Sequence, residues 1–341
     1  MGMNDNKKVL VVGAGGFTGG FIVDEALRRG YQVWAGIRHT TSREYLADTR
    51  INFIEFDFNN RDSIAQTLEK GLPDGEKWDY IVYNLGATKC LRYSDFSRIN
   101  CDYLRYFLEA LRMADKTPEK FLFISSLSAM GPGDEKGYTP FREDMVPMPN
   151  TRYGTSKHKA ELELQLSGIP YIIFRATGIY GPRDKDYFLM FKSIQTGFDF
   201  SVGLRPQRLT FLYVEDLARA IFDALEKSPV GEVYNVSEPR YYSQKEFRRL
   251  SARELGKKFV LPMCMPLWGV KAVSYIAEKI GVMRGKPSTL NSDKYRIMKQ
   301  RNWDVDVSKA QKGFGFAPRV DLEEGIKESV AWYRRQGWLG K

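Results

Sequence analysis

A glycine-rich segment directly after a short apolar run constrains the fold of this chain more than any other feature. Residues 13–19 read GAGGFTG and follow residues 7–12, KKVLVV. Glycine at positions 13, 16 and 19 suits a sharp turn, close approach of the backbone to a ligand, and close helix–strand packing. A helix is predicted over residues 17–29, and its free N–H groups and positive dipole end can bind phosphate. We therefore predict a dinucleotide site at Gly13, Gly16, Phe17 and Gly19, with a ligand-free tight turn as the alternative.

Strand-like and helix-like segments alternate through the first half of the chain. Predicted strands cover residues 7–12, 31–37, 51–56, 79–83, 120–125 and 169–175, and predicted helices cover 17–29, 61–70, 95–115 and 151–166. Such alternation is typical of an α/β fold with a doubly wound parallel Rossmann sheet. The ligand crevice of such a sheet lies at the carboxyl ends of its strands.

After Pro182 the alternation weakens, and Pro, Phe, Met and Trp become frequent. With 341 residues, the chain is long enough for a second, smaller unit. We predict that residues 7–180, with returns near 208–236, form the dinucleotide-binding Rossmann domain. Residues 181–207 and 237–338 are predicted to form a smaller C-terminal substrate-binding subdomain that covers the crevice.

The residues after the second predicted strand bear on which dinucleotide binds. A carboxylate here would bond the ribose hydroxyls of NAD, but the sequence reads IRHTT and has no acidic residue. Arg38 can form a charge-assisted contact with the 2′-phosphate of NADP. We therefore predict a preference for NADP. Two alternatives stay open, namely NAD held by backbone contacts and a plain surface position for Arg38.

The ends of the third and fourth predicted strands supply further candidate cofactor contacts. Asp57 and Phe58 follow the third strand, where the carboxylate can accept a hydrogen bond from the adenine amino group. The alternative for Asp57 is a cap on the following helix. Leu85, Gly86 and Ala87 follow the fourth strand, where the glycine lets the backbone pass close to the cofactor. A plain turn is the competing interpretation there.

A tyrosine and a lysine four residues apart lie in the predicted helix over residues 151–166. Tyr153 and Lys157 form a Y-x-x-x-K pattern, which places both side chains on one helix face. The lysine ammonium stabilises a tyrosinate, so Tyr153 can exchange a proton with a carbonyl or hydroxyl oxygen. Such pairs also arise by chance, but here Ser125, Ser126 and Ser128 end the fifth strand at the predicted crevice. We predict that this serine cluster faces the substrate oxygen.

The glycine loop, the serine cluster and the tyrosine–lysine pair, in this order, resemble the extended short-chain dehydrogenase/reductase family of the NAD-dependent epimerase/dehydratase type. The resemblance runs from about residue 7 to residue 338 and includes Asn100, RATGIYGP (175–182), FLYVED (211–216) and YNV (234–236). It implies an NAD(P)-dependent enzyme in which Ser126 is the catalytic serine and Tyr153 the proton donor or acceptor. It also implies that Tyr153 and Lys157 contact the cofactor, with Lys157 on the nicotinamide ribose.

Departures from the family pattern favour one of its branches. Sugar-nucleotide members commonly carry Asn where this chain has Gly178, and Arg where it has Leu209, with Arg208 one residue away. Dehydratases commonly carry an Asp-Glu pair after the catalytic serine, where this chain has Leu127 and Ser128. The chain resembles most closely the 3β-hydroxysteroid/sterol dehydrogenase and dihydroflavonol reductase branch. We therefore predict an oxidoreductase that interconverts a secondary alcohol and a ketone on an apolar, steroid-like or long-chain substrate. The alternative is a sugar-nucleotide epimerase with tightly bound NAD.

Charge and composition narrow the range of partners. The formal net charge is +10, from 52 Lys+Arg against 42 Asp+Glu. The basic residues are dispersed, which disfavours nucleic-acid binding and favours an anionic small ligand or membrane surface. Three cysteines and two histidines predict no metal site and suit a reducing, cytoplasmic location. The resemblance implies a homodimer formed through the helices over residues 95–115 and 151–166.

The apolar residues 259–270 and the segment 271–282 have two interpretations. They could line a lipid-shaped pocket or lie on a membrane surface, with Lys271 and Lys279 meeting lipid phosphates. Alternatively, they form the core of the subdomain itself together with a surface helix, and this is the interpretation that we favour.

Overall fold

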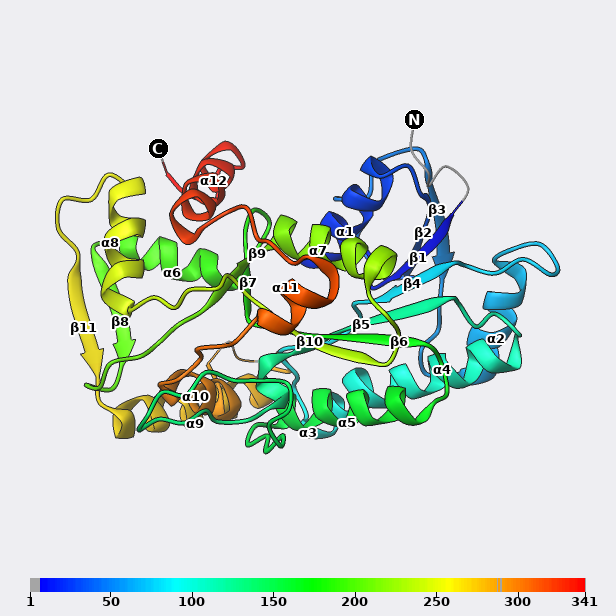
Figure 1. Ribbon diagram of the computed structural model, residues 1–341. Helices are drawn as coiled ribbons and strands as arrows, with labels where there is room; N and C mark the ends of the chain where they lie inside the picture. Colours follow the sequence, from blue (N-terminus) through cyan, green and yellow to red (C-terminus); the bar gives the residue numbers. More distant parts are fainter. Residues whose placement is uncertain (1–6, 287, 289, 341) are drawn as a thin grey trace.

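A seven-stranded parallel sheet forms the centre of the protein (Figure 1). The computed structural model describes residues 7–286, 288 and 290–340. Every neighbouring pair of strands in the sheet is parallel, which confirms the predicted doubly wound Rossmann sheet. In spatial order the strands are β3 (Ile51–Glu55), β2 (Gln32–Ile37), β1 (Lys8–Val12), β4 (Tyr80–Tyr83), β5 (Lys120–Ser126), β6 (Tyr171–Ala176) and β10 (Glu232–Val236).

Helices cover both faces of this sheet (Figure 1). Val9 and Val11 of β1 belong to the hydrophobic core on one face, and Leu10 and Val12 belong to the core on the other face. Because β1 is buried on both sides, its sequence is an unbroken apolar run and does not alternate with polar residues. The helices are α1 (Phe17–Arg28), α7 (Val214–Lys227) and α11 (Ser308–Phe314) on the first face, and α2 (Arg61–Lys70), α4 (Tyr103–Met113) and α5 (Arg152–Leu166) on the second.

The strand register brings three loops to one edge of the sheet. Val12 of β1 pairs with Tyr83 of β4, and Tyr83 pairs with Phe123 of β5. The glycine loop after β1, residues 84–87 after β4 and the serines that end β5 therefore begin side by side. They lie at the carboxyl ends of the strands, where parallel sheets of this type bind ligands.

The segment before β5 differs from the prediction of one helix over residues 95–115. It consists of α3 (Tyr93–Ser97), a π-helical turn (Arg98–Asp102) and α4. Asn100 lies in the π-helical turn and is fully buried. The prediction of one continuous helix is wrong here, because a wider turn interrupts the α-helical hydrogen bonds at the buried Asn100, and such turns are frequent at functional sites.

The other elements enclose a separate hydrophobic core, and most of them lie to the left of the sheet in Figure 1. Two small parallel pairs belong to this part, β7 (Gly178–Tyr180) with β9 (Phe211–Tyr213) and β8 (Phe198–Val202) with β11 (Leu261–Met265). Aromatic side chains dominate the core, including Phe191, Phe247 and Tyr333. The helices that line this core are α6 (Asp186–Gln195), α8 (Gln244–Glu254) and α12 (Leu322–Arg335), whereas α9 (Leu267–Met283) and α10 (Ser292–Lys299) pack against each other and contribute no described residue to it.

Residues 259–270 contribute little to this core, so the interpretation that we favoured from the sequence is wrong for them. Phe259, Met263 and Trp268 are exposed, whereas Val260 and Val270 are buried. The interior is already filled by aromatic residues of α6, α8 and α12, which leaves no inner position for the larger side chains of this segment. None of the helices within the described residues is long and apolar enough to cross a membrane.

Candidate active site

Two close backbone contacts shape the glycine loop. Gly13 has a φ of +83°, a left-handed conformation, and a Cβ there would lie 2.8 Å from the main-chain nitrogen of Leu85. A Cβ at Gly19 would lie 2.3 Å from the carbonyl oxygen of Gly13, so α1 packs directly on the loop. Both positions require glycine for steric reasons.

Gly16, in contrast, faces open space at the N-terminus of α1. It is the N-cap residue, no side chain caps the helix, and a Cβ here would lie 3.5 Å from its nearest neighbour, the carbonyl oxygen of Gly13. The ring of Phe17 packs edge-on against Phe21, so Phe17 offers its main chain, and not its side chain, to a ligand at this end of the helix. The first turn contains no acidic residue. The open helix terminus suits an anion such as a pyrophosphate.

Arg38 follows β2 on a loop that borders the glycine loop. A Cβ at Gly15 would lie 2.1 Å from Cγ2 of Thr41, which shows how closely the two loops approach. The side chain of Arg38 is exposed and forms no ion pair with the described residues. Arg43 on the same loop is already paired with Glu55 at 3.0 Å. Of these two guanidinium groups, Arg38 is therefore the one available to a ligand.

Asp57 is exposed after β3, and one of its oxygens, Oδ1, accepts hydrogen bonds from the main-chain and side-chain N–H groups of Asn59 at 3.0 and 3.1 Å. Asn60, in contrast, caps α2 by accepting a hydrogen bond from the main-chain N–H of Ser63 at 3.1 Å. The alternative interpretation of Asp57 as the helix cap is therefore wrong. The ring of Phe58 is buried, so this residue can reach a ligand only through its main chain.

Asn100 joins the loop after β4 to α5. Its Oδ1 accepts a hydrogen bond from the main-chain N–H of Ala87 at 2.7 Å, and its Nδ2 donates to the carbonyl oxygen of Ala87 at 3.0 Å and to Oγ of Ser156 at 2.9 Å. A Cβ at Gly86 would lie 3.2 Å from Oδ1 of Asn100 and 3.9 Å from Nζ of Lys157. The structure thus brings the predicted cofactor contacts of this loop next to the predicted catalytic helix.

The hydroxyl groups of Tyr153 and Ser126 lie close enough for Ser126 to lower the pKa of Tyr153 by hydrogen bonding. Tyr153 is half-buried in the first turn of α5, and the ring of Phe96 lies edge-on to it at a centroid distance of 6.5 Å. Burial raises the pKa of Tyr153, and the hydrogen bond from Ser126 opposes this effect. The predicted catalytic serine and tyrosine therefore meet at the carboxyl end of β5.

Lys157 lies one helical turn after Tyr153 and is buried. Its Nζ donates a hydrogen bond to the carbonyl oxygen of Ile124 at 2.7 Å and lies 4.0 Å from the ring centroid of Phe123. Burial lowers the pKa of Lys157 to about 7, although the nearby carboxylate of Glu161 favours the charged form. A lysine with such a pKa can change its charge near neutral pH.

Glu161 lies a further turn along α5 and anchors a buried ionic network. Its carboxylate forms a two-pronged ion pair with Arg175, with Nη2 at 2.7 Å and Nε at 3.1 Å, and accepts a hydrogen bond from Ser125. Burial favours the protonated acid, but the nearby ring of His158, the ion pair with Arg175 and the hydrogen bond from Ser125 keep the pKa of Glu161 below its usual value. The sequence carried a signal for this residue, because positions 153, 157 and 161 recur every four residues on one helix face.

Asp293 of α10 is a second residue that sequence reasoning missed. Its buried carboxylate accepts a hydrogen bond of 3.0 Å from the main-chain N–H of Tyr153, which lies 140 residues earlier in the chain. The contact ties the C-terminal part of the protein to the first turn of α5. No local pattern could have revealed it, because an aspartate in the first turn of a helix is explained equally well by the dipole of its own helix.

Gly178 and Leu209 stand where sugar-nucleotide relatives commonly carry the Asn and the Arg that meet a diphosphate, and Arg208 beside Leu209 is engaged in other contacts. A Cβ at Gly178 would lie 2.0 Å from the hydroxyl oxygen of Tyr187, so the tyrosine fills the space that an asparagine side chain would need. Arg208 forms an ion pair with Asp304 at 2.9 Å and lies over the rings of Tyr138 and Tyr241. The structure therefore offers neither side chain to a diphosphate.

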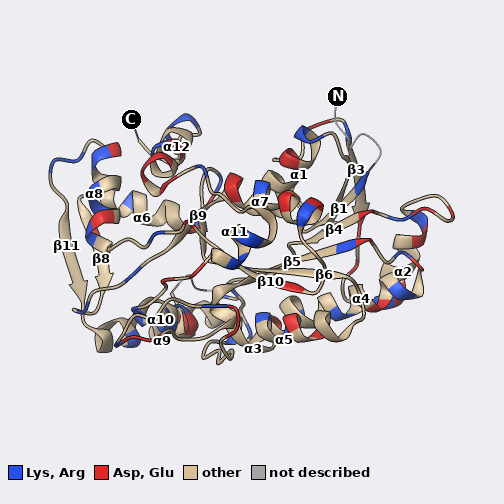
Figure 2. Ribbon diagram, in the orientation of Figure 1, with Lys and Arg blue, Asp and Glu red and all other residues tan. Residues whose placement is uncertain are grey.

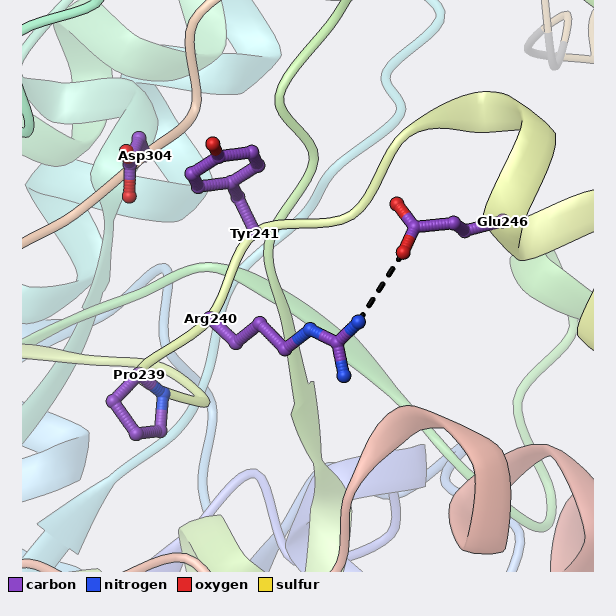
Figure 3. Close-up of a pocket in the computed structure, with 5 residues that line it drawn as sticks. All are labelled: Pro239, Arg240, Tyr241, Glu246 and Asp304. Atoms are coloured by element: carbon purple, nitrogen blue, oxygen red, sulfur yellow. Dashed lines mark hydrogen bonds and ion pairs between the residues drawn. The ribbon is translucent and has the colours of Figure 1, made fainter.

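An open hollow of about 570 Å³ lies elsewhere on the surface (Figure 3). Arg240 and Glu246 form an ion pair of 3.2 Å at one side of this hollow, and Tyr241 and Asp304 lie on the other. None of the predicted catalytic or cofactor residues lines it. We therefore assign the chemistry to the edge of the main sheet and not to this hollow.

Comparison with known proteins identifies the family. A model of the NAD dependent epimerase/dehydratase family matches residues 9–237, which is more than half of the chain. The chain belongs to this family. It is therefore an enzyme, and the predicted resemblance to the extended short-chain dehydrogenases/reductases is confirmed.

The relatives of this chain include proteins named for both reaction types considered above, a reductase and an epimerase. A ceramide reductase of Caulobacter vibrioides is 24% identical over 335 residues, which cover 98% of this chain and 96% of the relative. A UDP-glucose 4-epimerase of Vibrio cholerae is also 24% identical, with 95% of this chain and 94% of the relative covered. The fold matches the crystal structure of the enzyme WbmG of Bordetella bronchiseptica in complex with NAD and UDP, with a TM-score of 0.75, 20% identity, and 96% and 95% of the two chains covered.

The residues of the site fit a nicotinamide dinucleotide. The open N-terminus of α1 suits the pyrophosphate, and the loop around Gly86 adjoins Lys157, where a nicotinamide ribose would lie. No carboxylate ends β2. Within the described part of the chain, no group of three or more His, Cys, Asp or Glu side chains could hold a metal ion.

Replacing Lys157 with Met should change how stability depends on pH. Because the pKa of Lys157 is about 7 in the folded protein and 10.5 without burial, the unfolded chain binds one more proton between these values. The wild-type protein therefore gains stability as the pH rises through this window, and the variant lacks this gain. Relative to wild type, the free energy of unfolding of the variant should fall by about 2 kcal/mol between pH 7 and pH 9. Urea titrations of wild type and variant at pH 7 and pH 9 measure this change in the free energy of unfolding. Parallel pH profiles of the two proteins would contradict the prediction.

Replacing Asp293 with Ala should weaken the first turn of α5. The variant leaves the main-chain N–H of Tyr153 without its acceptor, so we expect a loss of about 1 kcal/mol in stability and a lower turnover. Asp293→Asn keeps an acceptor oxygen and should restore most of both. The control is Asp62→Ala, because Asp62 holds the same position in the first turn of α2 but is exposed. Equal effects of D293A and D62A on turnover would contradict the role of this contact.

Proposed function

We propose that this enzyme is an NADP(H)-dependent oxidoreductase that interconverts a secondary alcohol and a ketone on an apolar, lipid-like substrate. Three parts of the proposal rest on different observations. The reaction rests on Ser126, Tyr153 and Lys157, the substrate class on the surroundings of Gly178, and the cofactor preference on Arg38.

The hydroxyl pair of Tyr153 and Ser126 supports the reaction. In the direction of reduction, Ser126 holds the carbonyl oxygen of the substrate and Tyr153 donates a proton to it. In oxidation, Tyr153 accepts the proton of the alcohol. The ammonium of Lys157 stabilises the tyrosinate that forms when the proton leaves. A nicotinamide bound at this site supplies or accepts a hydride at C4.

The ring of Tyr187 is the observation that carries the substrate class. Its hydroxyl occupies the space beside Gly178 where sugar-nucleotide relatives commonly place an asparagine, and Arg208 is held by Asp304. A diphosphate would lose both of its usual partners, and burying its charge without partners is costly. An apolar substrate needs neither. The resemblance to a ceramide reductase along nearly the whole chain supports the same class.

The test is a reaction with NADPH and a long-chain ketone. We expect NADPH to be oxidised in a one-to-one ratio with the alcohol formed, and UDP-glucose to give no product. The alternative function, a sugar-nucleotide epimerase, is favoured by the similarity to a UDP-glucose 4-epimerase. That function predicts NAD that stays bound through gel filtration and conversion of UDP-glucose without net consumption of cofactor.

Replacing Tyr153 with Phe removes the phenol that exchanges the substrate proton. Turnover should fall by a factor of roughly a hundred or more, while the dissociation constant for the cofactor changes little. Tyr106→Phe removes the same atom from a partly buried ring on α4 and serves as the control. Near-normal turnover in Y153F would overturn the mechanism.

Replacing Arg38 with Ala should weaken the binding of NADPH selectively. A guanidinium can form paired hydrogen bonds to a 2′-phosphate but contributes little to NADH, so the dissociation constant for NADPH should rise by roughly tenfold. Arg43→Ala, on the same loop, is the matched control and should have little effect, because Arg43 is engaged by Glu55. Equal losses for NADPH and NADH in R38A would mean that Arg38 reads no phosphate. If R38A bound NADPH and NADH as tightly as the wild-type protein, the assigned cofactor would be NAD.

A further inference from the structure

Exposed apolar side chains gather at one end of the protein, on β8, β11 and α9. Most of the large hydrophobic side chains that are exposed among the described residues come from these elements and the turns beside them. Trp268 is 76% exposed and Met283 is 87% exposed. Figure 1 shows β8 and β11 at the left end of the molecule, away from the seven-stranded sheet, and α9 along its lower edge, running from the lower left toward α3. We call this surface the apolar end. A contiguous exposed surface of this kind marks a contact with a partner or a membrane.

The two strands of the apolar end turn bulky side chains outward. Phe198 and Phe200 of β8 pair in register with Leu261 and Met263 of β11, and all four are exposed. Asp199, between the two phenylalanines, is buried. Because residues two apart share a face of a strand, the four exposed side chains form one apolar patch across the pair.

Helix α9 continues this surface, because a single residue, Pro266, separates it from β11. Its inner face carries Val270, Ser274 and Gly281, which are buried. Its outer face carries Tyr275 and Ile276, both more than half exposed. The outer face of α9 is thus more apolar and more aromatic than the inner face, the reverse of an ordinary surface helix.

Basic side chains border the apolar end. Residues 256–286 contain one acidic residue, Glu278, and its carboxylate accepts hydrogen bonds from the main-chain N–H and the hydroxyl of Ser292. Figure 2 shows the basic positions on the turn that leads into β11. Six exposed basic residues lie in this stretch, and none forms an ion pair with the described residues: Lys257, Lys258, Lys271, Lys279, Arg284 and Lys286.

We propose that the apolar end docks on the surface of an anionic lipid membrane. Tryptophan, tyrosine and aliphatic side chains insert at the boundary between headgroups and acyl chains, and lysines beside them meet the lipid phosphates. The apolar patch complements the acyl chains of such a membrane, and the basic border complements its anionic headgroups.

A second copy of the chain suits this surface less well. A two-fold contact would place the same patch against itself, so the unpaired cations of one copy would face those of the other. Repulsion between like charges would oppose this contact, whereas anionic headgroups neutralise the same charges.

Helix α9 also connects the apolar end to the active site. Glu278 and Val282 line a cavity together with Tyr93 and Phe96, and the ring of Phe96 contacts Tyr153. Helix α9 thus links the apolar end structurally to the surroundings of the predicted catalytic tyrosine. The docking proposal does not rest on the proposed function.

The test is co-sedimentation of the full-length protein with vesicles, which measures docking without catalysis. We expect the wild-type protein to bind vesicles of phosphatidylcholine mixed with phosphatidylglycerol, to bind less to phosphatidylcholine alone, and to lose binding as salt is added. Failure to bind the anionic vesicles would overturn the proposal and leave the proposed reaction untouched.

Two pairs of double variants separate the apolar and the electrostatic contributions. W268E/I276E should weaken vesicle binding by roughly tenfold or more, whereas the control V146E/L166E makes the same charge change at exposed apolar sites elsewhere and should weaken it much less. K271E/K279E should likewise weaken binding to anionic vesicles more than the control K136E/K159E, at exposed lysines outside the apolar end. All eight positions are exposed or solvent-facing, and urea titrations check that each variant is folded.

Two results would contradict the proposal. Equal losses in the apolar-end variants and their controls would mean that overall charge, and not this surface, causes binding. A wild-type dimer that W268E/I276E converts to a monomer in sedimentation velocity would assign the apolar end to a contact between copies of the chain.

Discussion

The buried side chain of Lys157 is the constraint on which the candidate site depends. Burial disfavours its charged form, and this effect is opposed by the hydrogen bond to the carbonyl oxygen of Ile124, the face of Phe123 and the negative charge of Glu161. Glu161 is buried in turn and needs Arg175. The network fixes α5 against β5 and β6, because its members come from all three elements. Tyr153 occupies the same helix face one turn earlier and is therefore held against Ser126.

The amide of Asn100 and the carboxylate of Asp293 extend this arrangement beyond the main sheet. Asn100 holds the loop after β4 against α5, so hydrogen bonds link the predicted cofactor loop to the predicted catalytic helix. Asp293 brings the C-terminal part of the chain to the first turn of α5. The C-terminal part of the chain thus also supports the predicted catalytic tyrosine.

The proposed substrate class and the proposed membrane contact are physically consistent with each other. An apolar substrate is found in a bilayer, and α9 has one face toward the outside of the molecule and another toward the cavity next to Phe96. Tyr187 fills the space beside Gly178, and Arg208 is engaged by Asp304, so neither position offers a partner to a diphosphate. An enzyme that serves a lipid-like ketone benefits from both features, since it must collect its substrate at a surface and has no use for a diphosphate site.

The sequence by itself determined the parallel sheet, the glycine loop and the pair of Tyr153 and Lys157, because each depends on short-range patterns. Unbroken apolar runs specify buried strands, and a four-residue spacing specifies one helix face. Other features were decided only by the tertiary structure. The π-helical turn at Asn100 and the contact of Asp293 with Tyr153 depend on residues distant in the chain, which no local pattern reports. The apolar run at residues 259–270 would look the same whether it packed inside or faced outward. Its larger side chains face outward, and the interior is occupied by the aromatic side chains of α6, α8 and α12.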